Sequence, residues 1–140
     1  MEKIYSRMEP AKVLQLLFKS SDIPNHEGKA IRQDFTPPEA NLQTLGHSAP
    51  AGHIVKPHYH TPLERVTQTT HEGIILLDGV IELSIYDLDY SLIEKRILQA
   101  GDCALILNGG HSFKIIEDAR FFEIKNGPYM GKAKDSSYIE

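Results

Sequence analysis

The sequence has only one cysteine, Cys103, so no disulfide can form within the chain. Chains without disulfides are typical of reducing compartments. No apolar run approaches the length of a membrane span, and the first ten residues lack the apolar stretch followed by small residues that marks a secretory signal. We therefore expect a cytoplasmic protein with no membrane partner.

Strong charge is also missing from the sequence. The formal net charge is −4, and the basic residues are scattered singly. Because nucleic-acid surfaces need clustered Lys and Arg, we expect no nucleic-acid partner. The phosphate-binding Gly-rich loop, the GxSxG elbow and the CxxC pair are all absent from the sequence. A length of 140 residues allows one domain with a real core.

Residues 11–19 (AKVLQLLFK) predict a short N-terminal helix. Val13, Leu14, Leu17 and Phe18 share one helical face, and Pro10 suits a first-turn position. Residues 20–40 are rich in turn-forming residues and predict an extended arm. The helix and arm, residues 1–40, are expected to pack on the main body.

From about Asn41 onward the apolar period changes to two, which is typical of strands. Residues 73–87 predict two strands with a sharp bend at Asp78–Gly79. Further strands are predicted over residues 92–98, 104–107, 112–116 and 120–124. Short strands with frequent turns indicate a mostly β protein, either a sandwich or a barrel.

Four of the seven histidines fall between Gly52 and His71. In a strand, His58 and His60 point to the same face, so both imidazoles can reach one point. Imidazole nitrogen is a common ligand of divalent metal ions. Read alone, the pair is a weak signal, because two exposed histidines on one strand often occur by chance, and polar residues that line a wet barrel mouth are the alternative.

Three spaced elements accompany this pair: Gly52 with His58 and His60, Glu72 with Gly79, and Gly101 with His111. Together they resemble the two motifs of the cupin superfamily. The resemblance implies a double-stranded β-helix, the jelly-roll barrel, over residues 41–128, followed by a tail over residues 129–140. It also implies one divalent metal ion inside the barrel, held by His58, His60, Glu72 and His111.

The sequence departs from the cupin pattern at three places. Residues 61–71 separate His60 from Glu72, where the pattern has a much shorter gap, so a loop is inserted. Glu64 in that loop is a rival to Glu72 as the carboxylate ligand, although Glu72 has the correct relation to Gly79. Leu107 replaces the usual proline, and His111 comes one residue early.

Several strings resemble a group of small bacterial cupins that are often encoded among genes for cell-surface polysaccharide synthesis. These strings are Glu64-Arg65, Thr70-His-Glu72, Asp102, Gly109-Gly-His111 and Glu123-Ile-Lys-Asn-Gly-Pro-Tyr129. The group implies no particular activity. It supports the cupin assignment over roughly residues 28–135.

Several further residues could take part in a site. Glu64, Glu123 and Tyr129 are candidate catalytic residues. Each also has an ordinary structural explanation. Glu64 could form a solvated ion pair with Arg65, Glu123 could form a surface ion pair with Lys125, and Tyr129 could pack on the outside of the barrel. Cys103 is expected to be buried and inert. The other histidines are expected outside the site: His71 facing outward beside Glu72, His53 opposite His58, and His26 and His47 facing solvent.

Two classes of function remain. One is a metal-dependent enzyme, an isomerase, epimerase or dioxygenase acting on a small polar or sugar-derived molecule through Fe, Mn, Ni or Zn. The other is a non-catalytic module that binds a sugar or metabolite in the same barrel. In either case, small cupins commonly pair through sheet edges, so a homodimer is expected.

Overall fold

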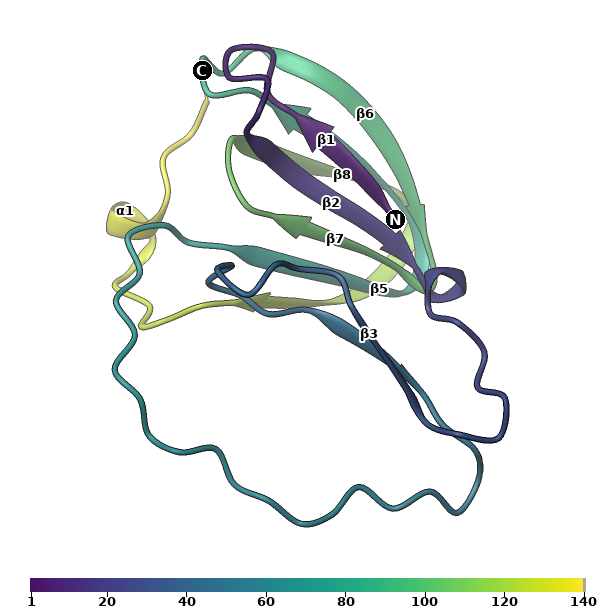
Figure 1. The fold of residues 1–140 in the computed structure, drawn as a ribbon. Helices are drawn as coiled ribbons and strands as arrows, with labels where there is room; N and C mark the ends of the chain where they lie inside the picture. Colours follow the sequence, from purple (N-terminus) through teal and green to yellow (C-terminus); the bar gives the residue numbers. More distant parts are fainter. Residues whose placement is uncertain (140) are drawn as a thin grey trace.

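The computed structural model describes residues 1–139 and shows a mostly β protein with antiparallel sheets. One sheet has six strands and the other has two (Figure 1). The strands are β1 (Glu2–Tyr5), β2 (Val13–Lys19), β3 (Ile31–Asp34), β4 (Leu45–Ser48), β5 (Glu72–Tyr86), β6 (Leu92–Gln99), β7 (Asp102–Ile106) and β8 (Gly110–Lys125). Two short helical turns are η1 (Ser20–Asp22) and α1 (Lys132–Asp135). None of the described helices is long and apolar enough to cross a membrane. The last residue of the predicted tail, residue 140, lies outside the described residues.

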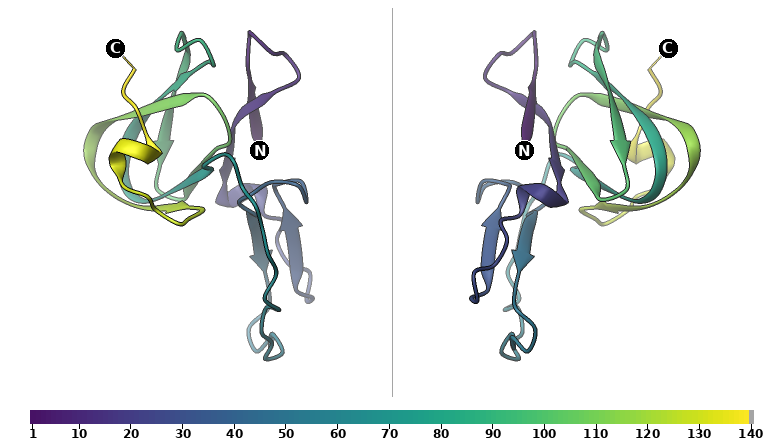
Figure 2. Two further views of the ribbon diagram at one scale, coloured as in Figure 1. Left: turned by 90° about the vertical axis from the view of Figure 1, so that its left-hand side faces the viewer. Right: turned by 90° about the vertical axis from the view of Figure 1, so that its right-hand side faces the viewer.

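Strand β5 organises the larger sheet, whose order is β1-β2-β7-β5-β6 with β8 also paired to β5. The first part of β5, from Glu72 to Ile75, pairs with β7, and the part from Val80 to Tyr86 pairs with β6. Strand β8 pairs with β5 along nearly its whole length. Because β6 and β7 each take a different half of β5, the sheet curls on itself, as both views of Figure 2 show.

The predicted bend at Asp78–Gly79 is confirmed, although the two predicted strands form one continuous strand. The pairing with β8 shifts register between Leu76 and Ile81, and Gly79 has φ of 81°. Positive φ is readily adopted by glycine, which has no Cβ. The predicted strands at 112–116 and 120–124 likewise join into the single long strand β8. Both β5 and β8 therefore bend without interruption and extend from one half of the sheet to the other.

The predicted helix over residues 11–19 is wrong, because residues 13–19 form β2 in the middle of the sheet. Five consecutive residues of β2, from Leu14 to Phe18, are buried. A strand that is covered on both faces has an unbroken apolar run, and such a run lacks the alternation that identifies a half-exposed strand. Because both faces of β2 are apolar, its leucines also happen to match the spacing of a helix.

Two hydrophobic cores lie on opposite faces of the larger sheet. The inner core fills the curl of the sheet, and the outer core lies between β2–β7 and the β3–β4 hairpin. In the outer core the rings of Phe18 and Phe35 stack with centroids 4.7 Å apart. The buried residues of the inner core are Ile4, Leu17, Ile74, Leu76, Ile81, Leu83, Ile85, Leu98, Ala104 and Ile106.

Residues 51–70, which we call the arm, form no part of either sheet. Every one of these residues is exposed, and none is assigned to a helix or strand in the described chain. The predicted strand carrying His58 and His60 is therefore wrong for this structure. In Figure 1 the arm runs as a long extended segment from the end of β4 to the start of β5, and Figure 2 shows it reaching away from the curled sheet.

Candidate functional site

The inner face of the curled sheet carries a small group of polar side chains beside its apolar core. Glu72 begins β5 and lies on the same face as the buried Ile74 and Leu76, since side chains two apart in a strand share a face. Lys125 is directly opposite Glu72 in the pairing of β5 with β8. His111, at the other end of β8, is opposite the inner-core residue Ile85. Strand pairing thus delivers residues distant in sequence to one surface.

Glu72 is the centre of this group. Its Oε1 lies 3.1 Å from Nε2 of His111, and its Oε2 lies 3.3 Å from Nζ of Lys125. Lys125 also contacts Oε1 of Glu123 at 2.6 Å. The Glu72 and His111 side chains are 13% and 26% exposed, so the pair is accessible to a small molecule but largely shielded. We call Glu72, His111, Lys125 and Glu123 the inner-face cluster.

The contacts of Glu72 favour its ionised form. The hydrogen bond with His111 has the largest effect and lowers the pKa of the carboxyl, and electrostatic interactions with His111 and Lys125 lower it further against the opposing effect of burial. The pKa of Lys125 is raised, chiefly by its hydrogen bond with Glu123 and also by Glu72, again against burial. The cluster therefore presents a carboxylate that contacts the His111 ring and is paired with the ammonium group of Lys125.

Gln15 is a polar residue at this site that the sequence reading missed. It is fully buried on β2, and the pairings of β2 with β7 and of β7 with β5 place Gln15, Ile106 and Glu72 in one row across the sheet. Its Nε2 donates to the carbonyl of Gly110 at 3.5 Å, while its Oε1 has no partner among the described residues. A lone glutamine inside the run VLQLLF was the available signal, and the helix prediction concealed it.

The four predicted metal ligands fall into two separate pairs. His58 and His60 lie in the exposed arm with ring centroids 5.5 Å apart, and Nδ1 of His58 is 2.9 Å from the carbonyl oxygen of Lys56. Glu72 and His111 lie together on the inner face. Within residues 1–139 no three His, Cys, Asp or Glu residues gather in a way that could hold a metal ion. In this arrangement the four residues do not fit a single ion.

The three candidate catalytic residues also divide. Glu123 joins the inner-face cluster through its contact with Lys125. Glu64 lies in the exposed arm, and Tyr129 is 66% exposed beyond the end of β8. Between the two rival carboxylates, the structure brings Glu72 into contact with His111 and leaves Glu64 in the arm.

The other histidines and the cysteine lie outside the inner-face cluster. His26, His47 and His53 are exposed, but His71 is buried, with Nδ1 unpartnered among the described residues and with its pKa lowered by burial. His71 was expected to point away from the face that Glu72 uses, and its burial shows that its side chain does not face solvent there. Burial raises the pKa of the Cys103 thiol to about 12, so it stays protonated at neutral pH.

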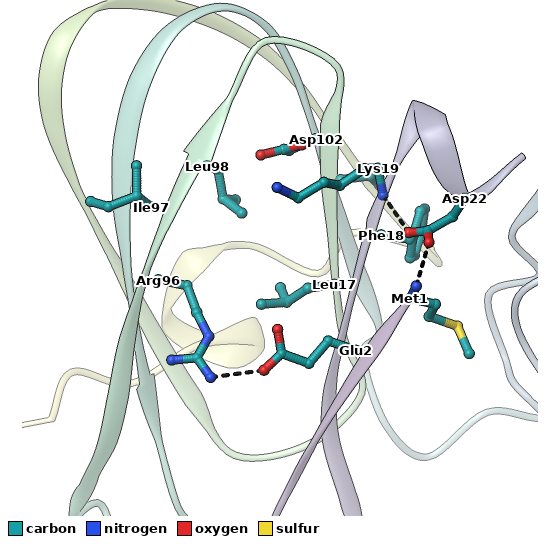
Figure 3. A pocket seen from close by; sticks show the side chains of 11 residues that line it. Met1, Glu2, Leu17, Phe18, Lys19, Asp22, Arg96, Ile97, Leu98 and Asp102 are labelled. Atoms are coloured by element: carbon teal, nitrogen blue, oxygen red, sulfur yellow. Dashed lines mark hydrogen bonds and ion pairs between the residues drawn. The ribbon is translucent and has the colours of Figure 1, made fainter.

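A separate cavity of about 340 Å³ opens between β1, β2, β6 and β7 (Figure 3). Two ion pairs lie along it: the amino group of Met1 contacts Asp22 at 2.6 Å, and Arg96 contacts Glu2 at 2.8 Å. None of the predicted metal ligands lines it. The cavity is therefore distinct from the inner-face cluster.

Comparison with known proteins adds no assignment. No protein-family model matches the chain, and no curated protein or solved structure is detectably similar to it. The case for function rests on the residues and geometry of the chain itself.

Proposed function

We propose that the protein is a metal-binding cupin-like protein that takes a small polar or sugar-derived molecule on the inner face of its sheet. In this proposal the curled sheet is an open form of the cupin jelly-roll barrel. Glu72 and His111 form one half of the metal site, and His58 and His60 form the other half. The observation that carries the proposal is the contact of Glu72 with His111.

The geometry of this pair suits two neighbouring ligands of one ion. Ligand atoms about 2.1 Å from a metal and at right angles to each other lie about 3 Å apart. Oε1 of Glu72 and Nε2 of His111 are separated by 3.1 Å. Imidazole and carboxylate together suit Fe(II), Mn(II), Ni(II) or Zn(II). A bound ion of this kind would supply a Lewis acid with open positions for an oxygen ligand.

His58 and His60 must approach the pair for the site to be complete. They share one face if the arm adopts a strand, because alternate side chains of a strand point the same way. The arm holds no strand in this structure, and its residues are free of the sheet. The proposal therefore requires the arm to become a strand of the barrel before four ligands can meet.

An isomerase, epimerase or dioxygenase would also need a titratable group beside the bound molecule. Glu123 is the candidate that the structure brings to the cluster, since its carboxylate contacts Lys125, which contacts Glu72. We assign Glu123 the acid–base role in the catalytic form of the proposal.

The second candidate function, a non-catalytic binding module, is favoured by the mutual pairing of the cluster. Glu72, His111, Lys125 and Glu123 satisfy one another without an ion. A hydroxylated molecule can insert into such a network, because hydroxyl groups both donate and accept hydrogen bonds. The unpartnered Oε1 of Gln15 supplies one further acceptor nearby.

Titration calorimetry of untagged protein with Zn²⁺, Mn²⁺, Ni²⁺ and Fe²⁺ tests the proposal, together with elemental analysis. We expect one ion per chain in the wild type. Affinity should fall by at least about 10-fold in Glu72→Gln and in His111→Ala, because the loss of a ligand should cost no less than the loss of an outer-shell partner. The paired change His58→Ala/His60→Ala should cause a similar loss.

The matched control is His26→Ala/His47→Ala, which removes two exposed histidines that belong to neither pair. This variant should retain wild-type affinity. A wild type that folds normally and binds none of the four ions contradicts the metal site, and so does an equal loss of affinity in the control. Binding of a sugar to a metal-free wild type would favour the second candidate.

A further inference from the structure

Two long parts of the described chain lack a neighbouring strand: one is an extended segment, and the other is the edge of a sheet. One is the arm, residues 51–70, an extended segment that belongs to no sheet. The other is the outer edge of β8, which pairs only with β5 among the described strands. Extended backbone and a free sheet edge are the two components of strand addition.

The free edge of β8 is unusually long. The strand covers 16 residues, against a typical strand length of about 5 or 6. Exposed edges of this length are templates for pairing with another segment. The strand also leaves large apolar side chains in water: Ile115, Ile116, Phe122 and Ile124 are all about half exposed. Both its backbone and its side chains indicate a missing neighbour.

The arm shows the complementary pattern. A loop of this length without secondary structure is uncommon in a compact domain unless it has a function. Five large apolar residues along it are more than two thirds exposed: Ile54, Val55, Tyr59, Leu63 and Val66. Apolar residues at this density are unusual in a segment meant to remain in water.

The arm does not fold back on its own β8 in this structure. One end follows β4, which lies in the hairpin over β2 and β7. The other end is tied down near β5, where Asn126 Nδ2 contacts Thr67 Oγ1 at 3.3 Å and Asn41 Nδ2 contacts Thr69 Oγ1 at 3.0 Å. Between these ends the arm reaches away from the sheet, and β8 curves round the opposite side (Figure 2).

We propose that two copies of the chain exchange arms, so that residues 53–61 of each copy add to the free edge of β8 in the other. Each chain has one arm and one β8 edge, so the exchange is reciprocal and closes as a two-fold dimer without further growth. His58 and His60 of one copy then lie beside the Glu72–His111 pair of the other. The supply of histidines rests on the proposed metal function, but the exchange itself does not.

Pro57 sets the orientation of the added strand. Proline has no N–H to donate, so it is tolerated in an edge strand only where its backbone faces away from the neighbour. The backbone groups of Lys56 and His58 then face β8. The side chains of His58 and His60 share one face, which is the inner face of the sheet, and Val55 and Tyr59 take the other.

Cross-linking of native lysines tests the exchange directly. Lys56 lies in the arm and Lys114 on β8, and both are exposed. Protein grown on light and heavy nitrogen is mixed, equilibrated and treated with an amine-reactive reagent, and the linked peptides are weighed. We expect Lys56–Lys114 links between light and heavy chains, and a dimer by light scattering.

The internal control is Lys95–Lys114. Lys95 on β6 and Lys114 on β8 are both close enough to Glu82 to lower the pKa of its carboxyl, so the two lysines lie within one chain's own sheet. Their linked peptides should therefore be all light or all heavy. A monomer at about 100 µM overturns the exchange, because stable two-fold interfaces persist well below this concentration. Lys56–Lys114 links confined to single chains overturn it as well, and show that the arm closes on its own sheet.

Metal binding by mixed variants separates this inference from the proposed function. The variant His58→Ala/His60→Ala keeps an intact cluster, and Glu72→Gln/His111→Ala keeps an intact arm. Each alone should lose at least about 10-fold in affinity, and the metal concentration is set so that it saturates the wild type and leaves each variant largely empty. After mixing and equilibration, a dimer of one copy of each has one complete site, so about a quarter of the wild-type sites should return on random pairing.

No recovery on mixing, with metal-binding wild type and freely exchanging subunits, overturns the exchange and leaves the metal site standing. A wild type that binds no metal but gives Lys56–Lys114 links between chains overturns the metal site and leaves the exchange standing. The two failures are therefore distinguishable.

Discussion

Strand β5 and the arm are neighbours in the chain and comparable in length, and both carry large apolar side chains, yet β5 buries them and the arm does not. Ile74, Ile81, Leu83 and Ile85 of β5 are completely buried, and the strand is paired on both edges. The arm also carries large apolar residues, but all of them are exposed. The presence of apolar residues therefore does not decide burial in this protein. What decides it is the availability of a neighbouring strand.

Leucine truncation should show the largest difference between the two regions. Leu83→Ala removes a fully buried side chain of the inner core and should lower the free energy of unfolding by about 2–5 kcal/mol. Leu63→Ala makes the same chemical change in the arm, where the side chain is 69% exposed. In dilute, monomeric protein it should change stability by no more than about 0.5 kcal/mol.

Urea unfolding followed by circular dichroism gives both values. If Leu63→Ala in the monomer costs as much as Leu83→Ala, the arm is packed against the body and the contrast between the two regions fails. A cost that appears only at high protein concentration sharpens the contrast, because it assigns the arm's packing to the dimer.

A pair of glycines gives a smaller but cleaner test. Gly79 in β5 and Gly52 in the arm have nearly the same backbone, with φ of 81° and 80°. A Cβ on Gly79 would overlap the Asp118 carbonyl oxygen and come within 2.6 Å of Cα of Ala119, whereas a Cβ on Gly52 would have nothing within 4 Å. Gly52→Ala should therefore cost only the left-handed conformation, about 1 kcal/mol.

Gly79→Ala carries that same cost and must also push β8 away from β5, so we expect a total of about 2–4 kcal/mol. The measurement is again the midpoint of urea unfolding, compared between variants whose free energy of unfolding depends equally steeply on urea concentration. Equal costs for the two substitutions would mean that the bend of β5 is not held tightly against Asp118 and Ala119.

Much of the body could be predicted from sequence, because its turns have local chemical signals. The bend at Asp78–Gly79 followed from glycine, and the second half of β5 followed from the period-two alternation of Ile81, Leu83 and Ile85. Strand β2 could not be predicted in this way. Its burial on both faces comes from two cores that form only when distant segments pack around it. Long-range contacts of this kind leave no local period.

The candidate site divides in the same manner. Glu72 was preferred to Glu64 for its spacing from Gly79, and the structure brings Glu72 into contact with His111. Gln15 was missed because its strand was missed. The strand predicted around His58 and His60 depends on a neighbour for its backbone, and no periodicity in the arm itself can show whether that neighbour is present. Sequence indicates which residues can form strands, but the available edges determine which of them do.

Acid unfolding should give the smallest contrast. Asp87, just after β5, is a buried carboxylate that accepts hydrogen bonds from Ser6 Oγ at 2.5 Å, Arg7 N at 2.7 Å and Leu88 N at 2.8 Å. Burial raises its pKa, but the hydrogen bonds from the Ser6 hydroxyl and the nearby backbone N–H groups outweigh it, so the net pKa is lowered. A carboxyl whose pKa is lower in the folded state stabilises the fold above its unfolded pKa of about 3.9 and loses this effect as the pH falls through its folded pKa.

Asp87→Asn should therefore lower stability at pH 7 and flatten the loss of stability below about pH 4, since an amide does not titrate in this range. The matched arm variant, Glu64→Gln, removes an exposed carboxylate and should leave the curve of urea midpoint against pH unchanged. If the urea midpoint of Asp87→Asn falls with pH as steeply as that of the wild type, Asp87 contributes no more to acid unfolding than an exposed carboxylate in the arm. The network that ties the N-terminal hairpin to the end of β5 would then owe its stability to shape and neutral hydrogen bonds, and charge would play no part in the difference between the two regions.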